Sequence, residues 1–281
     1  MIVATDRAAL AQGLSRLREG GRRVALVPTM GFLHEGHLSL VDEGASAADR
    51  TVVSIFVNPL QFGPSEDLDS YPRDRVRDLE LLRARGVDLV FAPEVGDMYP
   101  DGPPLVTVSP GPMERRLCGA FRPGHFRGVL TVVARLFGLI LPDVAIFGRK
   151  DYQQAVLIRR MVRDLELRVD IRTGPVVRED DGLAMSSRNA YLSADERADA
   201  AGIHQALRRA AELHAAGERR AGALVAAATD SIARRRLLEV QYVEAVHPDT
   251  LEAVSEAEPG TVLAVAAFCG TTRLIDNVDL G

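Results

Sequence analysis

The chain has 281 residues, of which 47% are apolar and 26% charged, and its formal net charge is −5 at pH 7. This length suits about two domains, and this composition is ordinary for a globular protein that buries a sizeable core. The acidic balance argues against binding of nucleic acid through a broad basic surface.

The cysteines and the apolar stretches exclude further classes of protein. Cys118 and Cys269 lie far apart in the sequence, which argues against a disulfide framework or a zinc ribbon. A charged amphipathic pattern follows Met1 in place of a signal peptide. The apolar run 129–141 is broken by Arg135 and is too short to span a membrane. We therefore expect a cytoplasmic protein that binds neither membranes nor nucleic acids.

Helices and strands alternate in the first part of the chain. Thr5 is the predicted N-cap of a first helix, which Gly20 and Gly21 end. The sequence predicts buried strands at 23–28, 51–57, 88–92, 143–147 and 166–173. It predicts further helices at 36–48, 75–85, 128–139 and 152–164. Short apolar strands separated by helices are typical of a parallel sheet covered on both faces. We predict a doubly wound, Rossmann-like α/β domain over residues 1–176, which binds ligands beyond the carboxyl ends of its strands.

The pattern changes after about residue 176. A polar loop leads into two helices rich in Ala and Arg, predicted at 194–216 and 220–235. The sequence then predicts strands at 239–246, 261–268 and 272–278. Two helices followed by a small antiparallel sheet make a smaller α+β domain, predicted over residues 177–281.

Two histidines stand where the first buried strand gives way to a helix, in the segment Gly31-Phe32-Leu33-His34-Glu35-Gly36-His37. A helix N-terminus attracts anions, because it presents unpaired N–H groups and a partial positive charge. If His34 lies just outside the helix and His37 in its first turn, both rings point at the same space. Imidazoles there can donate to phosphate oxygens during phosphoryl or nucleotidyl transfer. A cap or surface role for each histidine is the plain alternative, and a zinc site is a weaker one, because metalloprotease histidines are four residues apart.

Two amides follow the predicted strand 51–57. Asn58 and Gln61 thereby stand at the edge where a doubly wound sheet binds its ligands. An amide offers both a donor and an acceptor, which suits hydroxyl and carboxylate groups. A simple turn with a proline and a glycine is the alternative interpretation.

Phosphate-binding residue types occur in two further segments. Gly148 lets a ligand approach the backbone, Lys150 supplies a mobile positive charge, and Asp151 can accept from ribose hydroxyls. As an alternative, Asp151 is only the negative charge that favours a helix N-terminus. The segment Ser186-Ser187-Arg188 offers two hydroxyls and a guanidinium, which suit a phosphate clamp or form only a polar turn.

Taken in order, these motifs resemble the pantoate–β-alanine ligase (pantothenate synthetase) family of the HIGH-motif nucleotidyltransferases. The resemblance runs from Val27-Pro28-Thr29-Met30-Gly31 through Met185-Ser186-Ser187-Arg188-Asn189 to Thr271-Thr272-Arg273-Leu274-Ile275-Asp276-Asn277. It implies that ATP and pantoate give pantoyl adenylate and pyrophosphate, and that β-alanine then gives pantothenate and AMP. It also implies Mg²⁺ with the ATP, and a homodimer. Another HIGH-motif nucleotidyltransferase and a non-catalytic nucleotide-binding protein are the two alternatives.

The resemblance also implies roles for individual residues. It implies an ATP site made of Met30, His34, His37, Gly148, Lys150, Asp151, Val177, Ser186, Ser187 and Arg188. Of these, the residues implied to act in catalysis are His34, His37, Lys150, Ser186, Ser187 and Arg188. The residues implied to bind pantoate and β-alanine are Met30, Asn58, Gln61, Arg122, His125 and Gln154. Because water would destroy an acyl adenylate, we expect residues 177–281 to act as a lid.

Three positions bear on departures from the family's pattern. Asp78 matches an acidic position associated with the metal, but Arg77 beside it is basic where relatives often carry an acid. Arg149 stands where relatives commonly have an acidic or a neutral polar residue. Adjacent residues at a helix start diverge in direction, so we expect Arg149 to turn away from Lys150 into solvent.

Overall fold

The structure, a computed structural model, describes residues 1–64 and 66–281. It divides into two compact units that interleave along the chain. The first unit comprises Met1–Glu114, Arg122–Arg149 and Leu157–Pro175. The second comprises Arg115–Phe121, Lys150–Val156 and Val176–Gly281. The last crossing between the units lies next to the predicted boundary at 176/177, and the division into two functional domains there stays a prediction.

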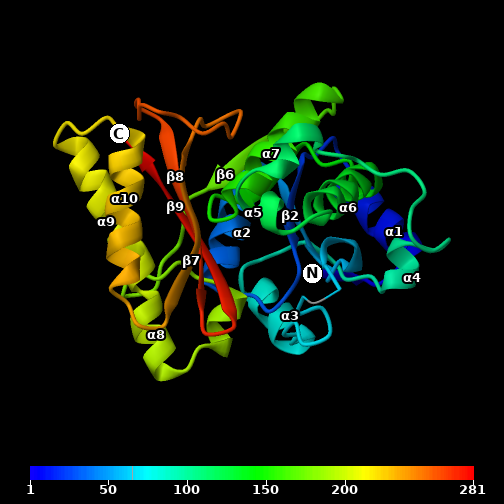
Figure 1. Cartoon of the computed structure of the whole chain (residues 1–281). Helices are drawn as coiled ribbons and strands as arrows, with labels where there is room; N and C mark the ends of the chain where they lie inside the picture. Colours follow the sequence, from blue (N-terminus) through cyan, green and yellow to red (C-terminus); the bar gives the residue numbers. More distant parts are fainter. Residues whose placement is uncertain (65) are drawn as a thin grey trace. The chain divides into compact units, whose positions relative to one another are not determined.

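A six-stranded parallel sheet forms the centre of the first unit (Figure 1). Its strands are β1 (Ile2–Ala4), β2 (Val24–Thr29), β3 (Arg50–Ile55), β4 (Leu89–Phe91), β5 (Val144–Gly148) and β6 (Asp170–Gly174). Their order across the sheet is β1-β4-β3-β2-β5-β6, and every pairing is parallel. The chain runs from β2 outward to β3 and returns on the other side of β2 as β5. This reversal of direction between β2 and β5 marks the crevice where such sheets bind ligands.

Helices cover both faces of this sheet, as predicted for a doubly wound fold. The helices of this part of the chain are α1 (Arg7–Leu17), α2 (Glu35–Ala47), α3 (Arg75–Ala84), α4 (Val95–Met98), α6 (His125–Ile140) and α7 (Tyr152–Asp164), with 3₁₀ turns η1 (Pro59–Gln61) and η2 (Gly111–Arg115). Helices α2 and α3 pack on the face that carries Val27 and Val90. Helix α1 covers the other face, where a Cβ on Gly13 would lie 2.4 Å from Leu89. Alternate residues of one strand thus point to opposite faces, and both sets are buried.

Some predicted boundaries are wrong. Strand β1 was not predicted, because its three residues give no usable pattern and pairing with β4 creates it. Asp6, and not Thr5, caps α1, since the Asp6 side chain accepts from the N–H of Ala9 at 2.8 Å. Helix α6 begins at His125 rather than at 128, and β6 begins at Asp170 rather than at 166.

The second unit contains a three-stranded antiparallel sheet and helices. Its elements are α5 (Leu117–Phe121), η3 (Ser187–Tyr191), α8 (Ala194–Ala200), α9 (Gly202–Ala215), α10 (Ala221–Ala233), β7 (Leu238–Val246), β8 (Thr261–Cys269) and β9 (Thr272–Leu280), and it includes the start of α7. The strand order is β7-β8-β9 (Figure 1). Apolar residues of α9, α10 and the sheet, such as Leu207, Leu224 and Leu263, form its core. The α+β prediction is confirmed, but the helix predicted at 194–216 is two helices that meet at Ala201.

Candidate active site

The histidine pair opens helix α2. His34 is the N-cap residue, with extended backbone, and His37 lies in the first helical turn. The centroids of the two rings are 4.0 Å apart. The predicted placement of the histidines is therefore confirmed, and both rings lie at the positive end of the helix.

Arg77 and Asp78 of α3 hold the loop that leads to this histidine pair. The carboxylate of Asp78 accepts from the N–H of Phe32 at 2.8 Å and from that of Leu33 at 2.7 Å. Gly31, at φ +87°, has the left-handed backbone that this turn requires, and a Cβ there would lie 3.0 Å from Asp78. Arg77 donates to the carbonyl of Leu33 at 2.9 Å. Arg77, which stands where relatives often carry an acid, thus helps to hold this loop.

Asp78 is almost fully buried, with 1% of its surface exposed. Burial raises the pKa of this carboxyl, and the two backbone N–H donors act in the opposite direction. Both oxygens are committed to the loop, so the metal role implied for Asp78 gains no support from its contacts. Among residues 1–64 and 66–281, no three or more His, Cys, Asp or Glu side chains are grouped so that they could hold a metal ion.

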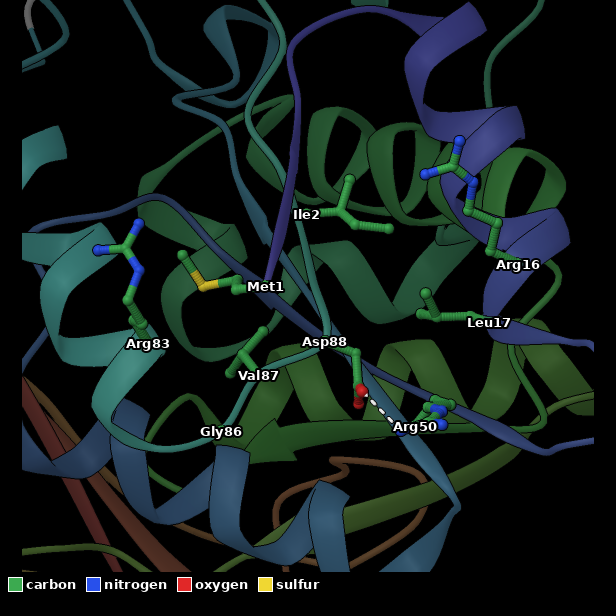
Figure 2. A pocket seen from close by; sticks show the side chains of 9 residues that line it. All are labelled: Met1, Ile2, Arg16, Leu17, Arg50, Arg83, Gly86, Val87 and Asp88. Atoms are coloured by element: carbon green, nitrogen blue, oxygen red, sulfur yellow. Dashed lines mark hydrogen bonds and ion pairs between the residues drawn. The ribbon is translucent and has the colours of Figure 1, made fainter.

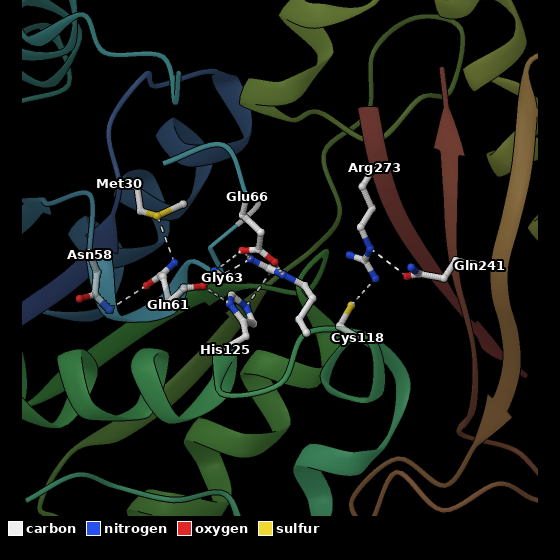
Figure 3. A network of polar contacts seen from close by, with 10 residues as sticks. Met30, Asn58, Gln61, Gly63, Glu66, Cys118, His125, Gln241 and Arg273 are labelled. Atoms are coloured by element: carbon white, nitrogen blue, oxygen red, sulfur yellow. Dashed lines mark hydrogen bonds and ion pairs between the residues drawn. The ribbon is translucent and has the colours of Figure 1, made fainter. Parts of the chain in front are cut away.

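The two predicted amides lie together after β3, at η1. Asn58 Nδ2 donates to Gln61 Oε1 at 3.1 Å and to the carbonyl of Gly128 at 3.2 Å. Its Oδ1 accepts from the hydroxyl of Tyr99 at 2.8 Å and from a backbone N–H. Gln61 Nε2 in turn lies 3.1 Å from the sulfur of Met30 (Figure 3). The side chain of Asn58, which is 1% exposed, therefore makes its hydrogen bonds to protein atoms and orients Gln61.

The predicted residues Arg122 and His125 both contact Gln61, and Glu66 contacts Arg122. Figure 3 shows Glu66 and His125 beside Gln61. His125 Nδ1 lies 2.8 Å from the carbonyl oxygen of Gln61, and Arg122 Nη2 donates to the same oxygen at 3.4 Å. Glu66 accepts two hydrogen bonds from Arg122, each 2.6 Å long. Burial of Glu66 opposes its ionisation, but the hydrogen bonds and charge of Arg122 outweigh it and lower the pKa to about 2.

The sequence reasoning missed Glu66. Its partner Arg122 lies 56 residues further along the chain, and no spacing rule connects positions that far apart. Only the surplus of polar residues in the loop after Gln61 could have drawn attention to it.

A pocket of about 360 Å³ lies elsewhere in the first unit (Figure 2). Its lining includes Ile2, Arg16, Arg50, Arg83 and Asp88. Ile2, Arg50 and Asp88 stand at the amino ends of β1, β3 and β4, and Arg50 is paired with Asp88 at 2.9 Å. The histidine pair follows the carboxyl end of β2, so this pocket is not part of the candidate site.

Lys150 is the only lysine of the chain; the other 33 of its 34 Lys and Arg residues are arginines. Its side chain is one-fifth exposed and lies 3.9 Å from a carboxylate oxygen of Asp151. Asn277 of β9 donates to the carbonyl of Lys150 at 3.1 Å. Arg149, expected in solvent, is half-buried, and its N–H donates to the carbonyl of Gly174 at 2.9 Å. Gly148, in the first unit, ends strand β5.

The segment Ser186-Ser187-Arg188 follows a short hairpin in the second unit. Met185 donates to the carbonyl of Val177 at 3.0 Å, and Ser186 caps η3 through the N–H of Arg188. Arg178 of the hairpin forms two hydrogen bonds, of 2.6 and 3.0 Å, with the buried carboxylate of Asp276. Because Asp276 and Asn277 are neighbours on β9, this strand contacts both the hairpin and Lys150.

The remaining predicted residue, Gln154, stands at the start of α7. Its neighbour Gln153 is buried. The Gln153 amide accepts from the N–H of Gly119 at 3.2 Å and donates to the carbonyl of Arg116 at 2.8 Å. The half-buried side chain of Gln154 makes no hydrogen bond to another residue that the structure describes. Its amide is therefore available to a ligand.

Comparisons with known proteins match this geometry. The sequence profile described as Pantoate-beta-alanine ligase matches residues 2–279. The chain belongs to the pantoate–β-alanine ligase family. Members of this family are enzymes, and the resemblance seen in the motifs is confirmed. None of the helices that the structure describes has the length and apolarity needed to cross a membrane.

Individual relatives of the pantoate–β-alanine ligase family match over almost their whole length. The pantothenate synthetase of Thermoanaerobacter pseudethanolicus is 50% identical over 278 residues, which are 99% of this chain and 98% of that protein. The crystal structure of pantothenate synthetase from Thermus thermophilus is similar at a TM-score of 0.93 and 45% identity, covering 100% of this chain and 99% of that one. A Francisella tularensis pantoate–β-alanine ligase, crystallised with beta-gamma ATP and beta-alanine, has a TM-score of 0.81 and 32% identity, covering 99% and 97% of the two chains.

Proposed function

We propose that this chain joins pantoate to β-alanine with ATP, through a pantoyl-adenylate intermediate, and releases AMP and pyrophosphate. The family match over residues 2–279 carries this proposal. A carboxylate is a poor acyl donor, and adenylation converts it to a mixed anhydride with AMP as leaving group. Positioning and charge neutralisation can then supply most of the catalysis without a covalent enzyme intermediate.

The phosphates of ATP would be bound by cationic and hydroxyl groups. His34 and His37, at the N-terminus of α2, would stabilise charge on the transferring α-phosphate. The residues that would neutralise the triphosphate are Lys150, Ser186, Ser187 and Arg188. Those that would contact the nucleoside are Gly148, Asp151 and the backbone of Val177.

Pantoate would be recognised by Met30, Gln61 and Gln154. Two observations support this assignment. The amide of Gln154 bonds no other described residue, and the amide of Gln61 is oriented by Asn58 and Met30. We propose that Asn58, Arg122 and His125 act on the substrates through Gln61, since their contacts end on that residue or its neighbours.

Mg²⁺ would accompany the ATP. Because the described residues contain no cluster of ligating side chains, the ATP phosphates and water would supply most of its ligands. The Mg²⁺ would neutralise phosphate charge, and no step assigned here to a residue depends on it. We also propose, on the family resemblance, that the protein is a cytoplasmic homodimer and that residues 177–281 close over the reactants and exclude water.

The proposal is tested by exchange of labelled pyrophosphate into ATP. We expect exchange that requires pantoate but not β-alanine, because adenylation is a separate step. Adding β-alanine should yield AMP and pantothenate in equal amounts. The His37→Ala variant should lower the exchange rate by about 10²–10³-fold, as expected for loss of one preorganised donor.

Three results would contradict the proposal in different ways. Exchange that requires the amine would indicate a concerted reaction. A nucleotide conjugate as final product would indicate another nucleotidyltransferase. Binding of ATP without turnover would indicate a non-catalytic nucleotide-binding protein.

A further inference from the structure

Glu66 lies among the predicted substrate residues but belongs to none of the motifs. Its Oε1 accepts from Arg122 Nε and its Oε2 from Arg122 Nη2, both at 2.6 Å. The N–H of Gly63 donates to Oε2 at 3.2 Å, which fixes the carboxylate (Figure 3). Two parallel charge-assisted hydrogen bonds of this kind fix direction as well as distance.

The other donors of Arg122 also point at protein atoms. Nη1 lies 3.0 Å from His125 Nε2, and Nη2 donates to the carbonyl of Gln61. Because a carbonyl oxygen only accepts, the ring hydrogen of His125 is on Nδ1, 2.8 Å from that same oxygen. His125 Nε2 then accepts from Arg122. The guanidinium thus has partners on Nε and on both terminal nitrogens.

Burial makes this arrangement costly to disturb. The side chain of Arg122 is 15% exposed and that of Glu66 is 24% exposed. The low pKa of Glu66 keeps the pair ionised at neutral pH. Removing the carboxylate would leave a largely buried guanidinium without its counter-charge, which is unfavourable enough to move it.

We propose that Glu66 is a positioning residue for pantoate, which acts by holding Arg122 and His125 on the backbone carbonyl of Gln61. The carbonyl is held by these two donors, and the side chain of Gln61 is held by Asn58 and Met30. Fixing both ends of Gln61 fixes the direction of its amide. This inference rests on the proposed function. It implies that Arg122 supports Gln61 and does not itself bind a carboxylate of the substrate.

The Glu66→Gln variant tests the inference, because it keeps the shape and removes the charge. We expect the KM for pantoate to rise about tenfold or more, since misplacement of a positioning group by about 1 Å costs up to about 10²-fold. The KM for ATP should stay unchanged. Glu66→Asp keeps the charge, so its KM for pantoate should lie between those of Glu66→Gln and the wild type. Glu80→Gln is the matched control, because Glu80 is an exposed carboxylate of α3 without an ion pair to any described residue.

Two further measurements separate positioning from general stability. The double variant Glu66→Gln/Arg122→Gln should be no worse than Arg122→Gln alone, because Glu66 acts through Arg122. The ¹⁵N shifts of His125 should show the Nδ1–H form in the wild type and loss of that single tautomer in Glu66→Gln. The His125 measurement needs no activity, so it tests the inference even if the proposed reaction is wrong.

Three outcomes would overturn the role of Glu66. A lower KM for pantoate in Glu66→Gln would mean that Glu66 keeps Arg122 from the substrate. Equal changes in both KM values would mean a general structural effect. An unaltered His125 tautomer would mean that Glu66 does not hold the network. Absence of pantoate-dependent exchange in the wild type would instead refute the proposed function.

Discussion

At the scale of the residue, Lys150 stands out because every other Lys or Arg position of this chain holds arginine. Arginine is a planar fork with a delocalised charge, whereas lysine is a compact ammonium on a flexible stem. A chain that uses arginine everywhere else and keeps one lysine at a proposed phosphate site points to a need for the compact charge.

We expect that Lys150→Arg will not restore activity. Lys150→Ala should lower pyrophosphate exchange by about 10²–10³-fold, and Lys150→Arg should remain close to Lys150→Ala, because the fork cannot take the place of a point charge. Exchange rates and melting temperatures of both variants provide the measurement. Arg209→Lys, an exposed change on α9, is the control for arginine–lysine exchange itself. A wild-type rate in Lys150→Arg would show that only the charge matters.

The sequence identified residues whose chemistry is local. The spacing of His34 and His37 and the strand before them were enough to place both rings at a helix start. The contacts of Glu66 with Arg122 and of Asp78 with the loop before α2 were not predicted. Both join distant positions, and no periodicity records such a contact.

At the scale of the element, the position of η1 depends on helix α6. A Cβ on Gly128 would lie 2.2 Å from the carbonyl oxygen of Leu60, so only glycine permits this approach. The same approach lets Asn58 donate to the carbonyl of Gly128. At Gly138, on the same helix, a Cβ would have no described atom within 4 Å apart from its chain neighbours and the nearby backbone of the helix itself.

We expect Gly128→Ala to displace η1 and with it Gln61. The KM for pantoate should rise and the melting temperature should fall, because overpacking costs about 1–3 kcal/mol. Gly138→Ala should leave the KM unchanged and stabilise the helix by up to about 1 kcal/mol. Steady-state kinetics and thermal unfolding of both variants check this. If the two variants had the same KM for pantoate and the same melting temperature, the close approach of η1 to α6 would not matter for substrate binding.

Elements with strong periodicity were predicted well, and those defined by their neighbours were not. Val24 to Val27 of β2 and Val144 to Phe147 of β5 are continuous apolar runs, and β3 is rich in β-branched residues. Strand β1 and helix α5 are short and exist because they pair or pack with distant segments. The break at Ala201 stands next to Gly202, a poor helix former, but a single glycine does not by itself end a helix.

At the scale of the whole molecule, alternation of strands and helices predicted the parallel sheet, but not the interleaving of the units. Two short segments, Arg115–Phe121 and Lys150–Val156, belong to the second unit although they lie within the first in sequence. Cys118 lies 3.1 Å from the hydroxyl of Tyr242, and Arg273 donates to the Cys118 sulfur at 3.4 Å. These contacts depend on tertiary structure alone.

We expect a fragment of residues 1–175 to be less stable than the whole chain. It retains Arg115–Phe121 and Lys150–Val156 but lacks their partners, which include Tyr242 for Cys118 and Asn277 for Lys150. Each kcal/mol lost should lower the melting temperature by about 2–4 °C. Calorimetry of the fragment, alone and mixed with residues 176–281, provides the measurement and its control. A fragment that melts as sharply and as high as the whole chain would show that the two units fold independently.

The single lysine also makes the proposed site chemically addressable. Acylating reagents that react with primary amines have one side-chain target in these 281 residues, Lys150, which is one-fifth exposed. Mass spectrometry would count the modified molecules directly, once modification of the α-amino group is counted separately. Protection by ATP would then report occupancy of the site, without mutation and without an enzymatic assay.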